Sequence, residues 1–318
     1  MSGRKSKTSA FGKARFDWYF KNGARIALKE MRFRRVSTAT ELLQPVVITF
    51  EPRSGSTWLI EMLAGLSNTV VVQDPLIERN GFAYAKLYGF ELRPLYFTAS
   101  EMDEAADYLD DVFALRRGGC VNFDSAGMGA SIISVVSKWA NTPWVSAWYA
   151  NRYGARNLYL LRHPLDTIRS QMNFFRTQEK LAYCVAHSEV RRRLPSEALE
   201  LCEIVLASGD EFQRRMLTLF IRWFPLIEDD DSAVSIIRYE DLVQGDYSRL
   251  EFLSAIDPNW SATLTSRSSI RSRSSARSRV IKEPLTMSDR EQKEFYERAI
   301  SSFGAEAFLK HNGYLQGA

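Results

Sequence analysis

The most informative segment of this chain is Pro45-Val46-Val47-Ile48-Thr49-Phe50-Glu51-Pro52-Arg53-Ser54-Gly55-Ser56-Thr57-Trp58-Leu59. Residues Pro45–Phe50 form a continuous apolar run, which is typical of a strand buried on both faces of a parallel sheet. A Gly/Ser/Thr turn follows, and a helix is predicted from Thr57 to Ser67. A strand, such a turn and a helix N-terminus together form an anion site, made of backbone N–H groups, hydroxyls and the positive end of the helix dipole.

A second stretch repeats this arrangement about a hundred residues later, Leu160-Leu161-Arg162-His163-Pro164-Leu165-Asp166-Thr167-Ile168-Arg169-Ser170. It ends a strand predicted at Asn157–Leu161, and Pro164 stands where a proline commonly opens a helix, here expected to run to about Arg176. Two anion sites on one sheet indicate a ligand with two separate phosphate-like groups. A mononucleotide triphosphate would need only one.

The remaining pattern alternates strands and helices. Further strands are predicted at Thr69–Gln73, Ser131–Val136 and Ala233–Ile237. Further helices are predicted at Glu101–Arg116, near Trp144–Tyr153, at Ser196–Ile227 and at Asp289–Phe303. Residues 74–100 are rich in Gly, Pro and Tyr, and we expect them to be irregular and to face a substrate. The alternation predicts an α/β fold with a doubly wound, mainly parallel sheet and a P-loop-like strand–loop–helix, and ligands bind such sheets at the carboxyl ends of the strands.

The bulk composition describes an ordinary globular protein of 318 residues, with 45% hydrophobic and 25% charged residues. We expect a basic leader with a short helix at 1–40 and a single domain at 41–318, which contains an Arg/Ser-rich loop at 260–283. The net charge of +4 is concentrated in the leader and does not by itself indicate nucleic acid. Scattered cysteines, no apolar signal segment and no long apolar run predict a cytoplasmic protein without a membrane span.

The first loop differs from a Walker A motif, because Gly55 is followed by Ser56-Thr57-Trp58 and not by Lys-Ser/Thr. Arg53 is the only cation in the loop, and no Asp that ends an apolar strand is evident as a Mg²⁺ ligand. His, Cys and Asp residues do not cluster at metal-ligand spacing either. The sequence therefore predicts an anion bound without a metal, by arginine and backbone groups.

Three motifs resemble those of sulfotransferases that use 3′-phosphoadenylyl sulfate (PAPS). Pro52–Leu59 resembles the family's 5′-phosphosulfate loop, and Arg162 with Ser170 resembles its 3′-phosphate motif. Ile237–Leu242 is similar to a Tyr-Glu-Asp-Leu stretch after a late strand. The motifs occur in the family's order over residues 45–255, and the resemblance implies a sulfotransferase-like three-layer sandwich.

The resemblance also implies which residues hold the donor. Arg53 would contact the sulfuryl group and the bridging oxygen. The 5′-phosphate would be held by Ser54, Gly55, Ser56 and Thr57. Trp58 matches a tryptophan that stacks on adenine, and Tyr239 matches a tyrosine near the base, although Trp58 judged alone is equally a core residue. Arg277 and Arg279 match a basic loop that closes over the 3′-phosphate.

The catalytic residues depart from the cytosolic members of that family. Lys138 falls where those members keep a lysine near the sulfate, but Ala140 occupies the position of their catalytic histidine. Val71–Leu76 resembles the Glu-Pro segment of glycan, tyrosyl-protein and bacterial glycolipid sulfotransferases, which makes Asp74 the first candidate for the base and Glu78 the second. An Asp before a proline is also a common turn, so both interpretations of Asp74 stay open.

The sequence thus predicts a PAPS-dependent sulfotransferase, free of metal, that acts on a hydroxyl group (an amine is the weaker alternative) of a carbohydrate or polar small molecule. Residues 74–100 and 176–200 are expected to shape the acceptor pocket. The alternatives are a P-loop nucleotide kinase-like enzyme and a non-catalytic anion- or RNA-binding protein. Nucleic acid is not expected as a partner, because the Arg/Ser run lacks interleaved aromatic residues. The sequence does not indicate the oligomeric state.

Overall fold

The computed structural model describes residues 22–31, 33, 42–122, 132–139, 143–174, 180–228, 234–268 and 287–315. Its sheet has the strand order β3-β2-β4-β1-β5-β6. The strands are β1 Val46–Phe50, β2 Thr69–Gln73, β3 Val121–Asn122, β4 Ser134–Trp139, β5 Arg156–Leu161 and β6 Val234–Arg238. All neighbours pair in parallel except β3, a short edge strand antiparallel to β2. The prediction of an α/β fold with a mainly parallel, doubly wound sheet is confirmed.

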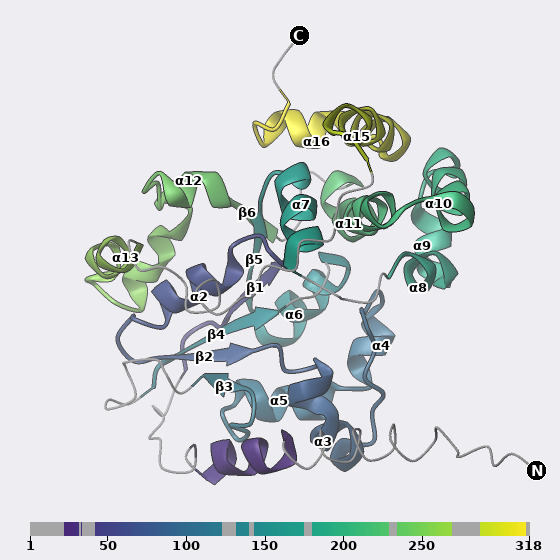
Figure 1. Cartoon of the computed structure of the whole chain (residues 1–318). Helices are drawn as coiled ribbons and strands as arrows, with labels where there is room; N and C mark the ends of the chain where they lie inside the picture. Colours follow the sequence, from purple (N-terminus) through teal and green to yellow (C-terminus); the bar gives the residue numbers. More distant parts are fainter. Residues whose placement is uncertain are drawn as a thin grey trace, which may run out of the picture.

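Helices cover both faces of this sheet (Figure 1). Those on one face are α2 Ser56–Leu63, α12 Tyr239–Val243, η2 Ser248–Ala255 and α13 Trp260–Ser268. Those on the other face, over β2, β4 and β1, are α3 Glu78–Tyr88, α5 Ala106–Phe113 and α6 Ser146–Tyr153, with α4 Ala99–Asp103 and η1 Pro143–Val145 beside them. A larger helical group lies beyond β5 and β6 and consists of α7 Pro164–Phe174, α8 Leu181–Ala186, α9 Ser188–Arg193, α10 Ser196–Ser208, α11 Glu211–Glu228, α15 Asp289–Phe303 and α16 Glu306–His311. Among the described residues, no helix combines the length and apolar character that crossing a membrane requires.

The central strand β1 is buried along its whole length, as its continuous apolar run predicts. Its side chains alternate between the two faces. Ile48 packs in the cluster under α2, whereas Val47 packs in the cluster under α5 and α6. After β1 the chain turns to α2 on one face, and after β5 it turns to α7 on the other face. The chain therefore leaves the carboxyl ends of the adjacent strands β1 and β5 toward opposite faces of the sheet. A doubly wound sheet binds its ligands at such a point.

Several sequence-based expectations about secondary structure were wrong. The single helices expected at Glu101–Arg116 and Ser196–Ile227 are each divided in two, into α4 and α5 and into α10 and α11, the latter pair separated at Gly209. Residues 74–100 are not irregular throughout, because α3 occupies Glu78–Tyr88. Both glycines have a role in this helix. A side chain at Gly81 would collide with the carbonyl of Pro75, and Gly89 is the C-cap of the helix, in the left-handed conformation. The third long strand is also displaced, from the expected Ser131–Val136 to Ser134–Trp139, because pairing with both neighbouring strands continues to its last residues.

Part of the basic N-terminal segment belongs to the folded core. Residues 22–31 form a helix, drawn in purple beside α3 and α5 in Figure 1. Ile26 and Phe33 are buried in the same cluster as α3 and α5. Lys29 Nζ donates to the carbonyl of Val121 at 2.7 Å, and Arg25 donates to the side chain of Asn80 at 3.0 Å. This helix therefore packs on the cluster that contains α3 and α5, and it is bonded to the start of β3.

Candidate functional site

The loop after β1 has an unusual backbone. Arg53 adopts a φ of 74°, and Gly55, the residue before α2, adopts a φ of 94°. A positive φ is rare for a side chain as large as arginine and costs of the order of 1–2 kcal/mol. The loop is closed by the Ser54 amide, which donates to the carbonyl of Glu51 at 3.0 Å. No side chain caps the N-terminus of α2 and no acidic residue lies in its first turn, so its positive end stays available to an anion.

The Ser54 hydroxyl is the clearest sign of a ligand in this loop. Ser54 is only 1% exposed, and within the described residues its Oγ has no hydrogen-bond partner. A buried hydroxyl without a partner is destabilising, and Ser54, unlike other buried hydroxyls in this state such as that of Thr167, lies in the turn before the uncapped end of α2. An anionic oxygen bound in the loop would satisfy it. Ser54, Gly55, Ser56 and Thr57 all lie at this turn between β1 and the start of α2.

Gly55 packs directly against the third motif. A methyl group at this position would overlap the ring of Tyr239, the first residue of α12. Trp58 on α2 meets the same ring edge to face, with the ring centroids 5.9 Å apart. The Trp58 Nε1 donates to the carbonyl of Ser268 at 3.1 Å, at the end of α13. Trp58 and Tyr239, which are only partly buried, therefore form a shared aromatic corner beside the loop.

We expect Gly55→Ala to destabilise the protein more than Gly245→Ala. Gly245 also has a positive φ, 85°, but a methyl group there would meet nothing within 4 Å. The control variant therefore carries only the backbone cost of about 1–2 kcal/mol. Gly55→Ala adds the overlap with Tyr239, a further cost of about 1–3 kcal/mol. Urea unfolding of both variants measures the difference, and equal costs would contradict the packing of Tyr239 on the loop.

The two arginine-bearing loops meet at the ends of β1 and β5. Arg162 Nη1 donates to the backbone carbonyl of Arg53 at 2.9 Å, and Arg53 Nε donates to Ser170 Oγ on α7 at 3.3 Å. Arg162 also lies over the ring of Tyr239, with 4.9 Å between its Cζ and the ring centroid. Burial, and then the charge of Arg162, lower the pKa of Arg53. Two guanidinium groups held this close favour a bound anion.

Glu240 joins the second motif to the third and was not singled out from the sequence. Its carboxylate accepts from the backbone amide of His163 at 3.1 Å and from the Tyr314 hydroxyl at 2.6 Å. Through Glu240, His163 is connected to α12 and to Tyr314, in the segment after α16. Burial lowers the pKa of His163, whose ring lies 5.4 Å from that of Tyr314. These contacts hold the end of β5 in place.

Lys138 and Asp74 follow on the other side of β1. Lys138 Nζ donates to Thr57 Oγ1 on α2 at 3.3 Å and lies 4.9 Å from the centroid of the Phe50 ring. The Asp74 amide donates to the carbonyl of Lys138 at 2.7 Å. Asp74 is 4% exposed and has a φ of 44°, whereas Glu78 is exposed at the start of α3. The structure thus brings Asp74 to the strand ends and leaves Glu78 at the surface.

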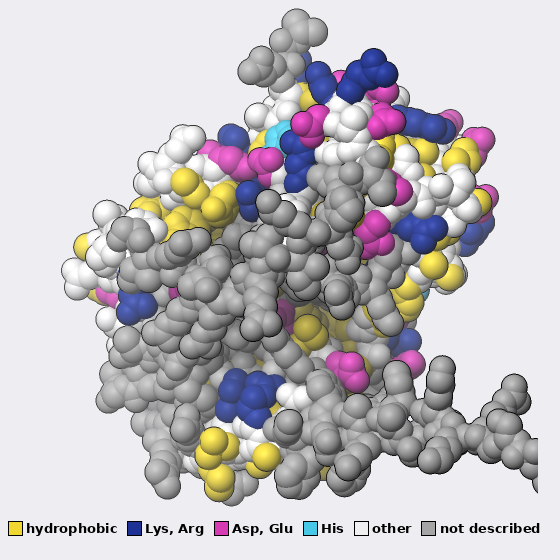
Figure 2. All heavy atoms as spheres, viewed as in Figure 1, with side chains coloured by type: hydrophobic (Ala, Val, Ile, Leu, Met, Phe, Trp, Pro, Cys, Tyr) yellow, Lys and Arg dark blue, Asp and Glu magenta, His cyan; other side chains and the backbone are white. Residues whose placement is uncertain are grey.

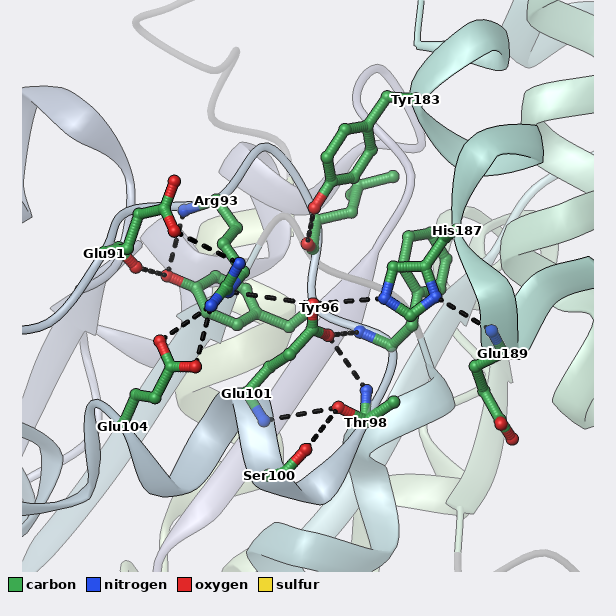
Figure 3. A network of polar contacts seen from close by, with 12 residues as sticks. Glu91, Arg93, Tyr96, Thr98, Ser100, Glu101, Glu104, Tyr183, His187 and Glu189 are labelled. Carbon is green, nitrogen blue, oxygen red and sulfur yellow. Dashed lines mark hydrogen bonds and ion pairs between the residues drawn. The ribbon is translucent and has the colours of Figure 1, made fainter.

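The segments that were expected to face the acceptor lie side by side. Tyr183 on α8 donates to the carbonyl of Leu95 at 3.0 Å, and Lys180 donates to the carbonyl of Pro94 at 3.1 Å. Figure 3 shows His187 turned toward Glu101, with 3.2 Å between Nε2 and Oε1, and Arg93 among Glu91, Glu101 and Glu104. Residues 91–104 are therefore hydrogen-bonded to α8, through Tyr183, and to the start of α9, through His187. Arg277 and Arg279 lie outside the described residues.

The chain is similar to sulfotransferases of known structure. It matches no protein-family model and no curated protein sequence. Among solved structures it is similar to the mouse sulfotransferase SULT7A1 complexed with PAP, with 11% identity, coverage of 92% of this chain and 95% of that chain, and a TM-score of 0.40. It is also similar to the sulfotransferase domain of the Synechococcus PCC 7002 olefin synthase, with 15% identity, coverage of 82% and 96%, and a TM-score of 0.32.

Proposed function

We propose that this protein is a sulfotransferase that moves a sulfuryl group from PAPS to a hydroxyl group. One observation carries the proposal: the hydrogen bond from Arg162 to the carbonyl of Arg53 joins the two anion-binding loops into one site. A ligand there would meet two cationic loops on adjacent strands at once. That arrangement suits an adenosine with anionic groups at both its 5′ and 3′ positions.

The residues present fit such a donor. The buried Ser54 hydroxyl, the uncapped N-terminus of α2 and the Arg53 guanidinium offer a cradle for its 5′ group. Arg162, with Ser170 on the next helix, offers a second cradle for its 3′-phosphate. Within the part of the chain that the structure describes, the contacts of Arg162 are with the Arg53 carbonyl and the Tyr239 ring and not with a carboxylate, so its charge is available to a ligand. Tyr239 and Trp58 supply aromatic surface beside the loop for the adenine.

The candidate residues are ordered along one edge of the sheet. From β2 to β6 they are Asp74, Lys138, Arg53, Arg162 and Tyr239. Neighbouring strands are about 4.8 Å apart, so the ends of β2 and β1, with β4 between them, are about 10 Å apart. The side chain of Lys138 is directed into that interval, toward Thr57. The donor would occupy the β1–β5–β6 side and the acceptor hydroxyl the β2 side.

This order suggests a division of labour in the transfer. The donor supplies the sulfur–oxygen bond that breaks as the acceptor oxygen bonds to sulfur. Arg53 and Lys138 would stabilise the negative charge on the departing bridging oxygen, a role typically worth 10²–10³ in rate per contact. Asp74 would orient the acceptor hydroxyl and take up its proton. We propose a carbohydrate or another polar small molecule as the acceptor, because the segments expected to face it contain the polar side chains shown in Figure 3.

A thermal-shift comparison tests the donor site. PAP, the product with both phosphates, is expected to stabilise the wild-type protein by about 3 kcal/mol at a hundredfold excess over its Kd, and ADP much less. Arg162→Ala should remove the preference for PAP, because it deletes the cation of the 3′ cradle. Arg169→Ala is the control, since Arg169 lies on α7, shortly after Arg162 in the chain, but pairs with Asp289 at 2.7 Å. Equal shifts with PAP and ADP in the wild type would favour a nucleotide kinase-like enzyme.

The charge pattern around α15 does not favour the RNA-binding alternative. Figure 2 shows positive and negative side chains mixed over the helices at the top of the view, where α15 lies. Two pairs on α15 are Arg290 with Glu294 at 3.3 Å and Lys293 with Glu297 at 3.8 Å. Nucleic acid binding depends instead on a continuous basic surface. Strongly salt-dependent RNA binding without stabilisation by PAP would reverse this preference.

A further inference from the structure

Three buried polar side chains lie directly behind the arginine loop and take no part in the steps proposed above. They are Glu51 at the end of β1, Gln171 on α7 and Arg222 on α11, and all three are buried. Arg222 Nη1 pairs with Glu51 Oε1 at 2.8 Å, and Gln171 Nε2 donates to the same oxygen at 3.3 Å. Burial raises the pKa of Glu51 against the opposing effect of Arg222. Within the described residues the other oxygen of Glu51 has no partner.

The same side chains hold the backbone of the loop. Arg222 Nη2 donates to the carbonyl of Phe50 at 3.3 Å, and Gln171 Nε2 donates to the carbonyl of Pro52 at 2.9 Å. The carbonyl between them, that of Glu51, accepts from the Ser54 amide at 3.0 Å. Three consecutive carbonyls are thus fixed immediately before Arg53.

The loop needs such support because Arg53 has a φ of 74°. A non-glycine residue stays in this conformation only where its surroundings determine it. Stability alone does not account for the cluster, since a buried ion pair adds little net stability compared with apolar side chains of similar size. Hydrogen bonds to defined carbonyls, by contrast, set the direction in which the next residue leaves the strand.

We propose that Glu51, Gln171 and Arg222 are positioning residues, which hold the loop so that the Arg53 guanidinium stays at the transferring group. The proposal rests on the function proposed above. Two adjacent residues of α7 would then act on Arg53 in different ways. Ser170 contacts the Arg53 side chain, while Gln171 contacts the backbone carbonyl of the preceding residue, Pro52. A displacement of about 1 Å at a reacting group can lower a rate by about 10²-fold.

Gln171→Leu tests the proposal without changing a charge. We expect kcat to fall by about 10–100-fold, with the acceptor KM unchanged. Thr167→Val is the matched control: Thr167 is one turn earlier on α7 and buried, its hydroxyl has no hydrogen-bond partner in the described structure, and its substitution should leave kcat unchanged. Equal kcat values for Gln171→Leu and Thr167→Val would overturn the proposal.

A double variant covers the case in which Gln171→Leu fails to fold. Glu51→Leu combined with Arg222→Met removes both members of the ion pair together, so neither is left buried without the other, and the fold is expected to persist. The bond to the Phe50 carbonyl is lost, and kcat should again fall at least tenfold. A double variant that folds and keeps the kcat of the wild type would overturn the proposal.

Hydrogen exchange separates this proposal from the proposed function. Whatever the reaction is, loss of the Gln171 contacts should speed amide exchange in residues 53–57 relative to Thr167→Val. Unchanged exchange there would refute the positioning role even in an active sulfotransferase. Faster exchange in a protein that does not prefer PAP to ADP would instead leave the positioning role standing and refute the donor assignment.

Discussion

Replacing Arg53 with alanine is expected to lower turnover by about 10²–10³-fold, the usual cost of losing one preorganised contact to developing charge. Arg53 lies at the junction of the two loops, where its carbonyl binds Arg162 and its side chain binds Ser170. Because the interaction would strengthen as charge develops on the bridging oxygen, the loss should appear in kcat more than in the Kd of PAP. Steady-state kinetics with labelled PAPS and a panel of hydroxyl acceptors measures it.

Arg169→Ala supplies the control for this experiment. It removes the same charge from the neighbouring helix, but its partners are Gln292 and Asp289 on α15. It should therefore change turnover by no more than about twofold, as a surface ion pair contributes little. An Arg53→Ala enzyme as active as Arg169→Ala would remove Arg53 from the reaction.

Asp74→Asn is expected to lower kcat by about 10²–10⁴-fold, the range for loss of a general base. Asparagine has nearly the same shape and tolerates positive φ, so the left-handed backbone of Asp74 should be kept. Its amide cannot accept the proton of the acceptor hydroxyl. Stabilisation by PAP should stay at the wild-type level, because Asp74 lies at the end of β2, away from β5 and β6. Kinetics and thermal shifts on one preparation measure both quantities.

Two further variants complete this test. Asp107→Asn, an exposed carboxylate on α5, controls for the loss of one negative charge and should leave kcat unchanged. Glu78→Gln separates the two candidate bases. A larger loss with Glu78→Gln than with Asp74→Asn would assign proton transfer to the exposed residue, and would require α3 to move toward the strand ends on binding.

Much of the sheet was predictable because most of its strands are short apolar runs, which can be recognised from their own residues without knowing which strands they pair with. Residues 69–73 were predicted with the bounds that the structure shows, and β1 and β5 to within one residue. Helix α15 was also predicted with its observed bounds, since Ser288 and Glu291 form a capping box that is visible in the sequence. The bounds of such elements follow from neighbouring residues in the sequence.

Helix α3 was missed because its glycines suggest a turn when they are considered locally. Gly81 is needed because the chain passes close to the carbonyl of Pro75, a contact that is evident only in the folded protein. The displaced third strand has a similar cause, because its end is set by pairing with β1 and β2. In both cases a tertiary contact overrides the local pattern.

Consecutive residues encode the sheet class and the two loops at Arg53 and Arg162, because a strand, a turn and a helix N-terminus are each local features. The folded chain adds the contacts that no local pattern shows, namely the bond from Arg162 to the Arg53 carbonyl and the support of the first loop by Gln171 and Arg222. Those side chains reach Glu51 from 120 and 171 residues away. Pairing over such distances depends on how α7 and α11 pack beside the sheet, and no local pattern specifies that packing.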